Sequence, residues 1–276
     1  MEKDRIRMFV TDLDGTLLSR FSTLSDRAAE DLKKLKENGI IVVICTGRPF
    51  YSVNRIIPEE LYDYAICMNG QDIYLPNGKR HIRQPYLRRE QVEYLLSFLE
   101  RYPLVAECNI NESSHHYIAK KYLYLKRGID LIKYFIDILQ HAQRYPIKLD
   151  TDYSDVSSHK LGKLCFAGLH MTLMQVVRQL PLDQYSVTYV NSRWIEIQTA
   201  NISKGLALRK VMYLTGVNKD ETVACGDGEN DIPMLQEVTH AVVMKNAMAK
   251  VRKYGKYTAG NCYDEGLAEW IERNLL

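Results

Sequence analysis

The sequence has no hydrophobic run that could span a membrane. Its longest apolar run, residues 40–45, is far shorter than the roughly 18–20 residues that a transmembrane helix needs. The first five residues are mostly charged, and no apolar signal segment follows them. We therefore expect a cytoplasmic protein with no membrane partner.

A charge excess of one sign is also missing. The chain has 37 Lys and Arg against 34 Asp and Glu, a formal net charge of +3. A protein that neutralises many nucleic-acid phosphates usually has a larger and clustered basic excess. Hydrophobic residues make up 46% and charged residues 26% of the 276 residues, which excludes a disordered or fibrous chain. We expect a globular monomer of one large or two modest domains, with no nucleic-acid partner.

Cysteine and histidine patterns typical of metal sites are absent as well. The six cysteines form no C-x-x-C pair, and Cys45, Cys67 and Cys225 lie in or at the end of apolar strand-like runs. We interpret the cysteines as reduced structural thiols. The histidines have no H-x-x-x-H spacing, and the adjacent His115 and His116 can be surface residues or substrate contacts.

Strand and helix patterns alternate in the first third of the chain. Residues 6–10 and 64–68 are short apolar runs with β character, and residues 40–44 are a continuous β-branched run. Between them, apolar residues recur at helical spacing in 25–38, and a shorter helix is expected at 50–56. This order is typical of a parallel sheet with right-handed crossovers.

The pattern then changes and later returns. Strands at 72–74 and 80–83 flank a Pro-Asn-Gly turn, which predicts a hairpin. Beyond it we expect helices at 89–99, 129–140 and 172–180, mixed with strands at 104–108, 117–119, 163–168 and 186–190. After residue 203 we expect helices at 206–214, 233–236 and 265–274 and strands at 222–225 and 241–244. The chain is thus predicted to be an α/β domain interrupted by an α+β insert of about 110 residues.

Two aspartates follow the first predicted strand, in Asp12-Leu13-Asp14-Gly15-Thr16-Leu17-Leu18. In an extended segment Asp12 and Asp14 would share one face, at the strand end where open parallel sheets bind ligands. Such a pair can divide its work, with one carboxylate as nucleophile and the other carrying a proton as general acid. The alternative is an Asx turn that only caps the strand.

Two further segments suit phosphate binding. Thr46-Gly47-Arg48 follows the second buried strand and offers a hydroxyl and backbone N–H groups at a helix N-terminus, although Thr-Gly is often only a turn. Ser203-Lys204-Gly205 opens a helix, where the ammonium of Lys204 can neutralise phosphate charge, although most lysines are simply solvated.

An acidic loop, Gly226-Asp227-Gly228-Glu229-Asn230-Asp231, follows a later apolar strand. Mg²⁺ usually takes one or two carboxylates and shares oxygens of a substrate phosphate, so this loop suits Mg²⁺. The alternative is a charged surface turn. Because all four motifs lie at carboxyl ends of predicted parallel strands or at the starts of helices, a doubly wound sheet would bring them to one crevice.

The four motifs resemble, in order, those of the haloacid dehalogenase (HAD) superfamily. Asp12 to Leu18 resembles the D-x-D-G-T-L signature, Thr46 and Lys204 match the second and third motifs, and Asp227 to Asp231 matches the fourth. The insert between the second and third motifs, and Asn69-Gly70 after Thr-Gly-Arg, resemble the Cof-type phosphatases of subfamily IIB with a C2B cap. The resemblance covers essentially the whole chain.

The resemblance implies a fold and a domain arrangement. We expect an α/β fold with a Rossmann-like parallel sheet core, formed by residues 1–85 and 194–276. Residues 86–193 would form an inserted α+β cap domain that closes over the core and sets substrate choice.

The resemblance also implies an activity, the Mg²⁺-dependent hydrolysis of a small phosphate monoester through an aspartyl-phosphate. Asp12 would be the nucleophile, and Asp14 the general acid and then the general base. Mg²⁺ would be held by the Asp12 carboxylate, the Asp14 backbone carbonyl and Asp227. The substrate would be a phosphorylated sugar or related metabolite, with flavin mononucleotide and pyridoxal phosphate as further candidates.

The remaining motif residues would serve the phosphate or support the site. Those expected to grip the phosphoryl oxygens are Thr46, Gly47, Lys204 and the backbone at Leu13. Asn230 would contact the phosphate or shape its loop, Asp231 would orient Lys204 or metal-bound water, and Arg48 would touch substrate or brace the core.

Two other functions remain open from the sequence alone. A phosphomutase or phosphotransferase with the same motifs would pass the phosphoryl group to another hydroxyl instead of water. A non-catalytic phospho-receiver also uses an acidic cluster, a Thr and a Lys, but it is usually shorter and has no need of Asp14.

Overall fold

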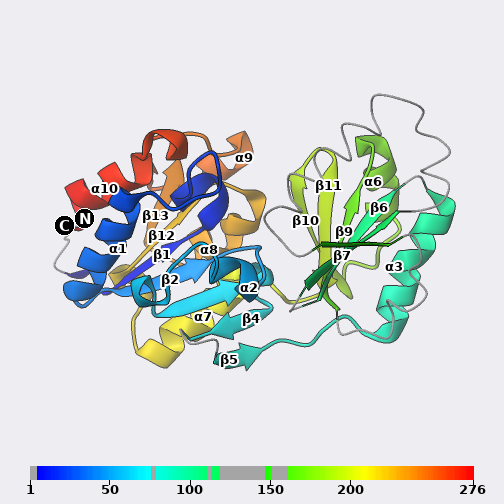
Figure 1. Cartoon of the computed structure of the whole chain (residues 1–276), viewed down its shortest axis with the longest axis horizontal. Coiled ribbons are helices and arrows are strands. Elements are labelled where there is room, and N and C mark those ends of the chain that lie inside the picture. The colour runs from blue at the N-terminus through cyan, green and yellow to red at the C-terminus, as the bar shows by residue number, and fades with distance from the viewer. Residues whose placement is uncertain (1–4, 76–78, 103, 111–112, 119–146, 151–160) are drawn as a thin grey trace. The chain divides into compact units, whose positions relative to one another are not determined.

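The computed structural model describes residues 5–75, 79–102, 104–110, 113–118, 147–150 and 161–276 (Figure 1). The chain divides into two compact units, which are treated separately below. Unit 1 comprises Met1–Gln84 and Ile202–Leu276, and unit 2 comprises Pro85–Asn201. The helix predicted at 129–140 lies outside the described residues, as does residue 119 of the strand predicted at 117–119.

Unit 1 is built on an eight-stranded sheet with the order β14-β13-β12-β1-β2-β3-β4-β5. From β14 to β3 all neighbouring strands are parallel, and β4 and β5 add an antiparallel hairpin at one edge. The strands are β1 (Met8–Thr11), β2 (Ile41–Cys45), β3 (Tyr64–Cys67), β4 (Asp72–Tyr74), β5 (Arg80–Arg83), β12 (Thr222–Gly226), β13 (His240–Met244) and β14 (Tyr257–Ala259). This is the predicted parallel α/β core with its predicted hairpin.

Helices cover both faces of the unit 1 sheet because successive side chains of each strand point to opposite faces. On β1, Phe9 packs in the core formed with α1 (Asp26–Glu37) and α10 (Gly266–Asn274). Its neighbours Met8 and Val10 pack in a second core, formed with α7 (Lys204–Thr215) and α8 (Ile232–Gln236) (Figure 1). The remaining helices are α2 (Phe50–Val53), α9 (Ala249–Arg252) and the short turns Leu13–Leu17, Glu59–Leu61, Met68–Gly70, Lys219–Glu221, Glu229–Asp231 and Cys262–Asp264.

Unit 2 is an α+β unit with a six-stranded sheet of order β10-β11-β9-β6-β7-β8. All its neighbouring strands are antiparallel except β7 and β8. The strands are β6 (Val105–Ile110), β7 (Ser113–Ile118), β8 (Ile147–Asp150), β9 (Leu161–Ala167), β10 (Tyr185–Asn191) and β11 (Trp194–Thr199). Its helices α3 (Arg89–Arg101) and α6 (His170–Val177) share a hydrophobic core with the sheet, in which Phe98 meets Phe166 edge to face.

The structure differs from the predicted elements in a few places. Strand β11 was not predicted, and because it pairs with both β9 and β10, unit 2 extends to Asn201 instead of ending at residue 193. Strands β8 and β14 and helix α9 were also missed, and α2 ends at Val53 instead of residue 56. Apart from the six-residue β11, these elements have only three or four residues, in which the hydrophobic period is hard to detect.

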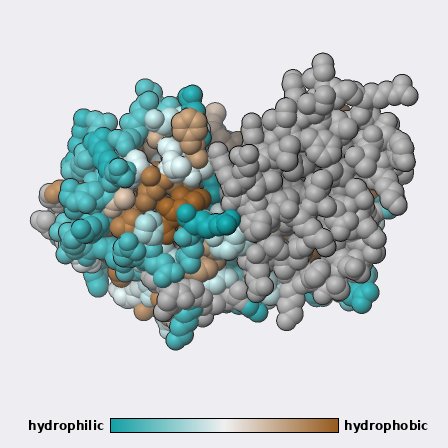
Figure 2. Space-filling view, viewed as in Figure 1, coloured by the Kyte–Doolittle hydropathy of each residue, from teal (hydrophilic) through white to brown (hydrophobic). Residues whose placement is uncertain are grey.

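None of the helices in the described part of the chain has the length and hydrophobicity required to span a bilayer. The face of unit 1 visible in Figure 2 is mainly hydrophilic, with a hydrophobic area near its centre. The described cysteines are all buried, and none of them forms a disulfide within the described residues.

A buried carboxylate lies at the contact between α1 and α10. Asp31 is only 1% exposed, and within the described residues no group donates a hydrogen bond to its Oδ2. Burial raises the pKa of Asp31 from 3.8 to about 6, and the Glu272 and Glu265 carboxylates add to this effect. The charges of Lys34 and Arg27 oppose it. The ionised form of Asp31 therefore destabilises the folded state.

We expect Asp31→Asn to stabilise the protein above about pH 6, by roughly 1 kcal/mol, because it removes a buried charge that lacks a full set of partners. The folded state holds the Asp31 proton more tightly than the unfolded state does. The contribution of Asp31 to stability is thus present below about pH 4 and is lost as the pH rises through about 6. Denaturant unfolding of both proteins from about pH 4 to pH 8 measures this. A stability difference that does not change with pH would contradict the prediction.

Candidate active site

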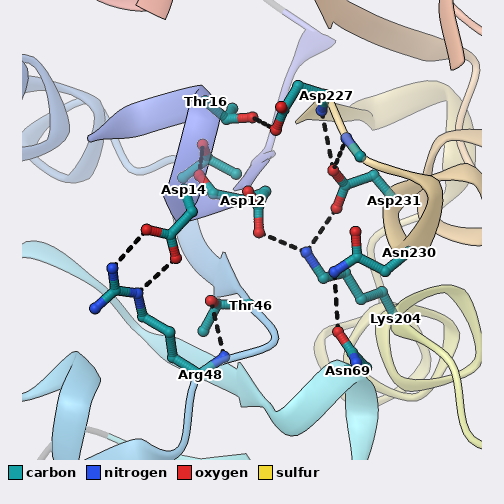
Figure 3. Close-up of polar contacts among 12 residues, drawn as sticks. Asp12, Asp14, Thr16, Thr46, Arg48, Asn69, Lys204, Asp227, Asn230 and Asp231 are labelled. Atoms are coloured by element: carbon teal, nitrogen blue, oxygen red, sulfur yellow. Dashed lines mark hydrogen bonds and ion pairs between the residues drawn. The ribbon is translucent and has the colours of Figure 1, made fainter. Parts of the chain in front are cut away.

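Three neighbouring strands carry the motif residues to one edge of the unit 1 sheet. Asp227, Asp12 and Thr46 directly follow β12, β1 and β2, and these strands lie side by side in the order β12-β1-β2. The strands are parallel, so their carboxyl ends meet at the same edge. Lys204, at the start of α7, reaches this edge from the other half of the sequence (Figure 3). The structure therefore brings all four predicted motifs together.

Lys204 lies at the centre of the site and is fully buried. Its Nζ donates hydrogen bonds to Asp12 Oδ1 at 2.5 Å and to Asp231 Oδ1 at 2.6 Å. Burial by itself would lower the pKa of Lys204, but the carboxylates of Asp12 and Asp231 outweigh that effect and raise it. Lys204 is therefore a permanent positive charge held between two buried acids.

The acidic loop after β12 is tied to the rest of the site by hydrogen bonds. Asp231 Oδ2 accepts bonds from the backbone N–H groups of Asp227 and Gly228, both at 2.9 Å. Asp227 Oδ1 accepts a bond of 3.0 Å from the Thr16 hydroxyl. Gly15 has a left-handed φ of +80°, and a Cβ there would lie 2.4 Å from Asp227 Oδ2. The glycine of the D-x-D-G-T-L segment thus lets the two loops approach closely.

Negative charge exceeds positive charge in this cluster. Asp12, Asp227 and Asp231 each offer a carboxylate oxygen within 4.8 Å of the others, and Lys204 is the ammonium that pairs with two of them. Burial raises the pKa of Asp12, with Asp231, Asp227 and Asp14 adding to the effect and Lys204 opposing it. Burial and Asp231 likewise raise the pKa of Asp227 to about 7. A bound cation would relieve this repulsion, so the residues fit a divalent metal.

The two aspartates after β1 have different surroundings. Asp12 is 5% exposed and faces Lys204, whereas the Asp14 side chain is half exposed and faces Arg48 (Figure 3). Arg48 Nε and Nη2 each donate a bond of 2.5 Å to a different Asp14 oxygen. Thr46 is buried, and its Oγ1 accepts a 3.1 Å bond from the Arg48 backbone N–H. The hydroxyl proton of Thr46 can still be donated to a phosphate oxygen.

The other predicted contacts lie on the surrounding loops. Asn230 Nδ2 donates a 3.0 Å bond to Asn69 Oδ1, and a Cβ on Gly47 would lie 3.1 Å from the same Asn69 oxygen. Leu13 is buried, and its carbonyl accepts a bond from the Leu18 N–H. Gly47, Asn69 and Asn230 therefore form a second small cluster beside the carboxylates.

Residues 9–271 of this chain match the family of haloacid dehalogenase-like hydrolases. The chain belongs to this family.

Several named proteins are similar to this chain over nearly its whole length. MG263 of Mycoplasma genitalium is 26% identical over an alignment of 306 residues that covers 99% of both proteins. YwtE of Bacillus subtilis, a 5-amino-6-(5-phospho-D-ribitylamino)uracil phosphatase, is 26% identical, with 98% of each chain covered. The solved structure of BT1666 of Bacteroides thetaiotaomicron, a HAD phosphatase, has a TM-score of 0.80 at 25% identity, covering 97% of this chain and 94% of that one. The predicted family, the α/β fold and the assignment as a hydrolase of phosphate esters are thereby confirmed.

Sequence reasoning assigned no role to three residues of this HAD-family site. These are Thr16, Asn69 and Asn246. Thr16 donates a hydrogen bond to Asp227, and Asn69 accepts one from Asn230. Asn246 Nδ2 donates a 2.7 Å bond to the Gly15 carbonyl. Asn69 and Asn246 come two residues after the ends of β3 and β13. Testing every polar residue just beyond a predicted parallel strand would have found both asparagines.

Proposed function

We propose that the chain is a Mg²⁺-dependent phosphatase that hydrolyses small phosphate monoesters through an aspartyl-phosphate on Asp12. One observation carries the proposal, namely the buried Asp12 carboxylate, hydrogen-bonded to Lys204, with Asp227 beside it. An anionic nucleophile and a phosphate dianion can meet only where positive charge surrounds them. Lys204 supplies one such charge. Asp12, the Asp14 backbone carbonyl and Asp227 would hold Mg²⁺, whose charge offsets the remaining repulsion.

The two aspartates divide the chemistry. Asp12 attacks phosphorus in line as the bond to the leaving oxygen breaks, and Asp14 gives that oxygen a proton. Asp14 then takes a proton from water, which attacks the phosphorus of the aspartyl-phosphate and releases phosphate. Asp14 suits this exchange with solvent because its side chain is half exposed, whereas Asp12 is held in a buried position.

The phosphoryl oxygens would be bound by the groups that surround Asp12. Lys204 would supply an ammonium and Thr46 a hydroxyl proton. Gly47 and Leu13 would supply their backbone N–H groups. Asn230 would complete the phosphate site from the acidic loop. Asp231 supports the site indirectly because both of its oxygens are occupied, one by Lys204 and the other by two backbone N–H groups.

Substrate choice would rest with unit 2, acting as a cap. The motif residues all lie in unit 1, so we assign none of the phosphate chemistry to unit 2. The Bacillus subtilis relative YwtE acts on a phosphorylated ribityl compound, which supports a sugar phosphate or a related metabolite as substrate. Exchanging unit 2 with that of such a relative would move the preference among substrates with it.

Hydrolysis in ¹⁸O-labelled water tests the proposed function. The purified protein is incubated with a panel of phosphorylated sugars and metabolites, and the released phosphate is analysed by mass spectrometry. Repeated turnover that places one solvent oxygen in each phosphate is the expected result. Transfer of the phosphoryl group to a second sugar hydroxyl would indicate a phosphotransferase instead. One phosphate bound per protein without turnover would indicate a phospho-receiver.

A further inference from the structure

Arg48 makes a bidentate contact with the carboxylate of Asp14. Its Nε donates to Asp14 Oδ2 and its Nη2 to Asp14 Oδ1, both at 2.5 Å (Figure 3). A planar guanidinium that bonds both oxygens of one carboxylate fixes the plane of that carboxylate as well as its position. A lysine ammonium, as a point charge, cannot impose that orientation.

Arg48 is itself held firmly, whereas Asp14 is not. The Arg48 side chain is 10% exposed, and its Nη1 donates a 3.2 Å bond to the buried hydroxyl of Ser52 on α2. The Arg48 backbone N–H bonds to Thr46 Oγ1, and its carbonyl accepts a 2.9 Å bond from the Met68 N–H. The Asp14 side chain is 50% exposed, and Asp14 lies in the turn Leu13–Leu17, directly before Gly15 with its left-handed φ. The orientation of Asp14 therefore depends on Arg48.

We propose that Arg48 is a positioning residue that aims the Asp14 carboxyl group at the leaving-group oxygen. This inference rests on the proposed function. In the first step Asp14 carries the proton on one oxygen, and Arg48 can keep a hydrogen bond to the other. As the phosphorus–oxygen bond breaks, that proton passes to the leaving oxygen, and the resulting carboxylate accepts both Arg48 bonds. The structure has this second arrangement, since both Asp14 oxygens accept.

The dependence of the rate on the leaving group tests this role. A nitrophenolate leaves without a proton, whereas an alkoxide needs one as the bond breaks. For Arg48→Gln we expect kcat/KM with glycerol 2-phosphate to fall about 100-fold or more, and with p-nitrophenyl phosphate by less than about threefold. Phenyl phosphate should lie between the two. We use kcat/KM because it reports the steps up to departure of the leaving group and excludes hydrolysis of the aspartyl-phosphate.

Three further variants separate positioning from folding and from substrate binding. Ser52→Ala removes one of the bonds that hold Arg48 and should reproduce the same leaving-group dependence with a smaller loss. Arg48→Gln added to Asp14→Asn should cause no further loss with glycerol 2-phosphate, because the group that Arg48 positions is already gone. Arg209→Gln is the matched control, since Arg209 makes the same two-bond contact, with Glu237, on the exposed surface of unit 1. That variant should keep wild-type kinetics.

The possible outcomes are distinct. Equal loss with all three esters in Arg48→Gln would mean that Arg48 binds the substrate phosphate or only braces the core, and would overturn the inference. A further loss of the double variant relative to Asp14→Asn would overturn it as well. If the wild-type protein hydrolyses none of these esters or of the metabolites tested above, the proposed function itself fails. If the wild type is active but the Arg48 variants do not distinguish the esters, only this inference fails.

Discussion

Replacing Asp12 by asparagine is expected to reduce phosphatase turnover by several orders of magnitude, the size of effect seen when a catalytic nucleophile is removed. The amide has nearly the same shape as the carboxylate, but it is a poor nucleophile and a weak metal ligand. Folding should be preserved because the amide oxygen can still accept the bond from Lys204, and Asp231 keeps its own bond to Lys204. Stability should not fall, since burial and neighbouring acids disfavour the ionised form of Asp12.

Phosphate release and thermal unfolding of Asp12→Asn, measured side by side, test this expectation. Asp31→Asn is the matched control, because it makes the same change at another buried carboxylate of unit 1 that lies outside the site. It should leave turnover unchanged. Activity of Asp12→Asn within about tenfold of the wild type would rule out Asp12 as the nucleophile.

Removal of divalent metal is expected to abolish activity completely. Of the three buried or half-buried carboxylates in the described residues, two pair with the ammonium of Lys204, and the substrate brings a further dianion. Without a cation, the raised pKa values of Asp12 and Asp227 favour protonation, which would remove the nucleophile's charge. Magnesium should restore turnover, whereas calcium should bind but restore little, because its looser and longer coordination misplaces the attacking oxygen.

Two measurements on metal-stripped protein check this prediction. Turnover is followed as Mg²⁺ or Ca²⁺ is added back, and binding is followed independently as a rise in the melting temperature. Asp227→Asn should need far more Mg²⁺ for both effects. Glu221→Gln, which changes a partly exposed acid elsewhere in unit 1, should behave as the wild type. Full activity of stripped protein in excess chelator would show that the acidic cluster does not depend on a metal.

Much of unit 1 could be read from local sequence patterns. The continuous apolar run at β2 and the helical spacing in α1 identify their elements because burial on two faces, or on one stripe, selects those residue types. The assignment failed at β11, whose six residues do not reveal whether they extend the core or pair with β10. Whether β11 belongs to unit 1 or unit 2 depends on its pairing with β10 and β9, which the sequence does not show. For this reason the predicted end of the insert, residue 193, precedes the end of unit 2 at Asn201.

The motif residues were also visible in the sequence, but their contacts were not. Asp12, Thr46 and Asp227 directly follow strands, and parallel strands must bring such positions to one edge. Asp14 lies in the turn just after Asp12, and Lys204 is the first residue of α7. The same reasoning did not decide whether Arg48 contacts the substrate or braces the core. It assigned no role to Thr16, Asn69 or Asn246. Hydrogen bonds between loops depend on how each loop turns, which the residue types alone do not specify.

The sequence by itself determined the fold class, the family and the residue types of the site, because strand periodicity and short motifs are local properties of the chain. Only the tertiary structure decided which of these groups meet. Lys204 lies 192 residues from Asp12, and it bonds Asp12 and Asp231 because β1, β12 and α7 pack around one core. The contact of Arg48 with Asp14 likewise joins the loops after β1 and β2. Such pairings are set by the long-range packing of the sheet and its helices.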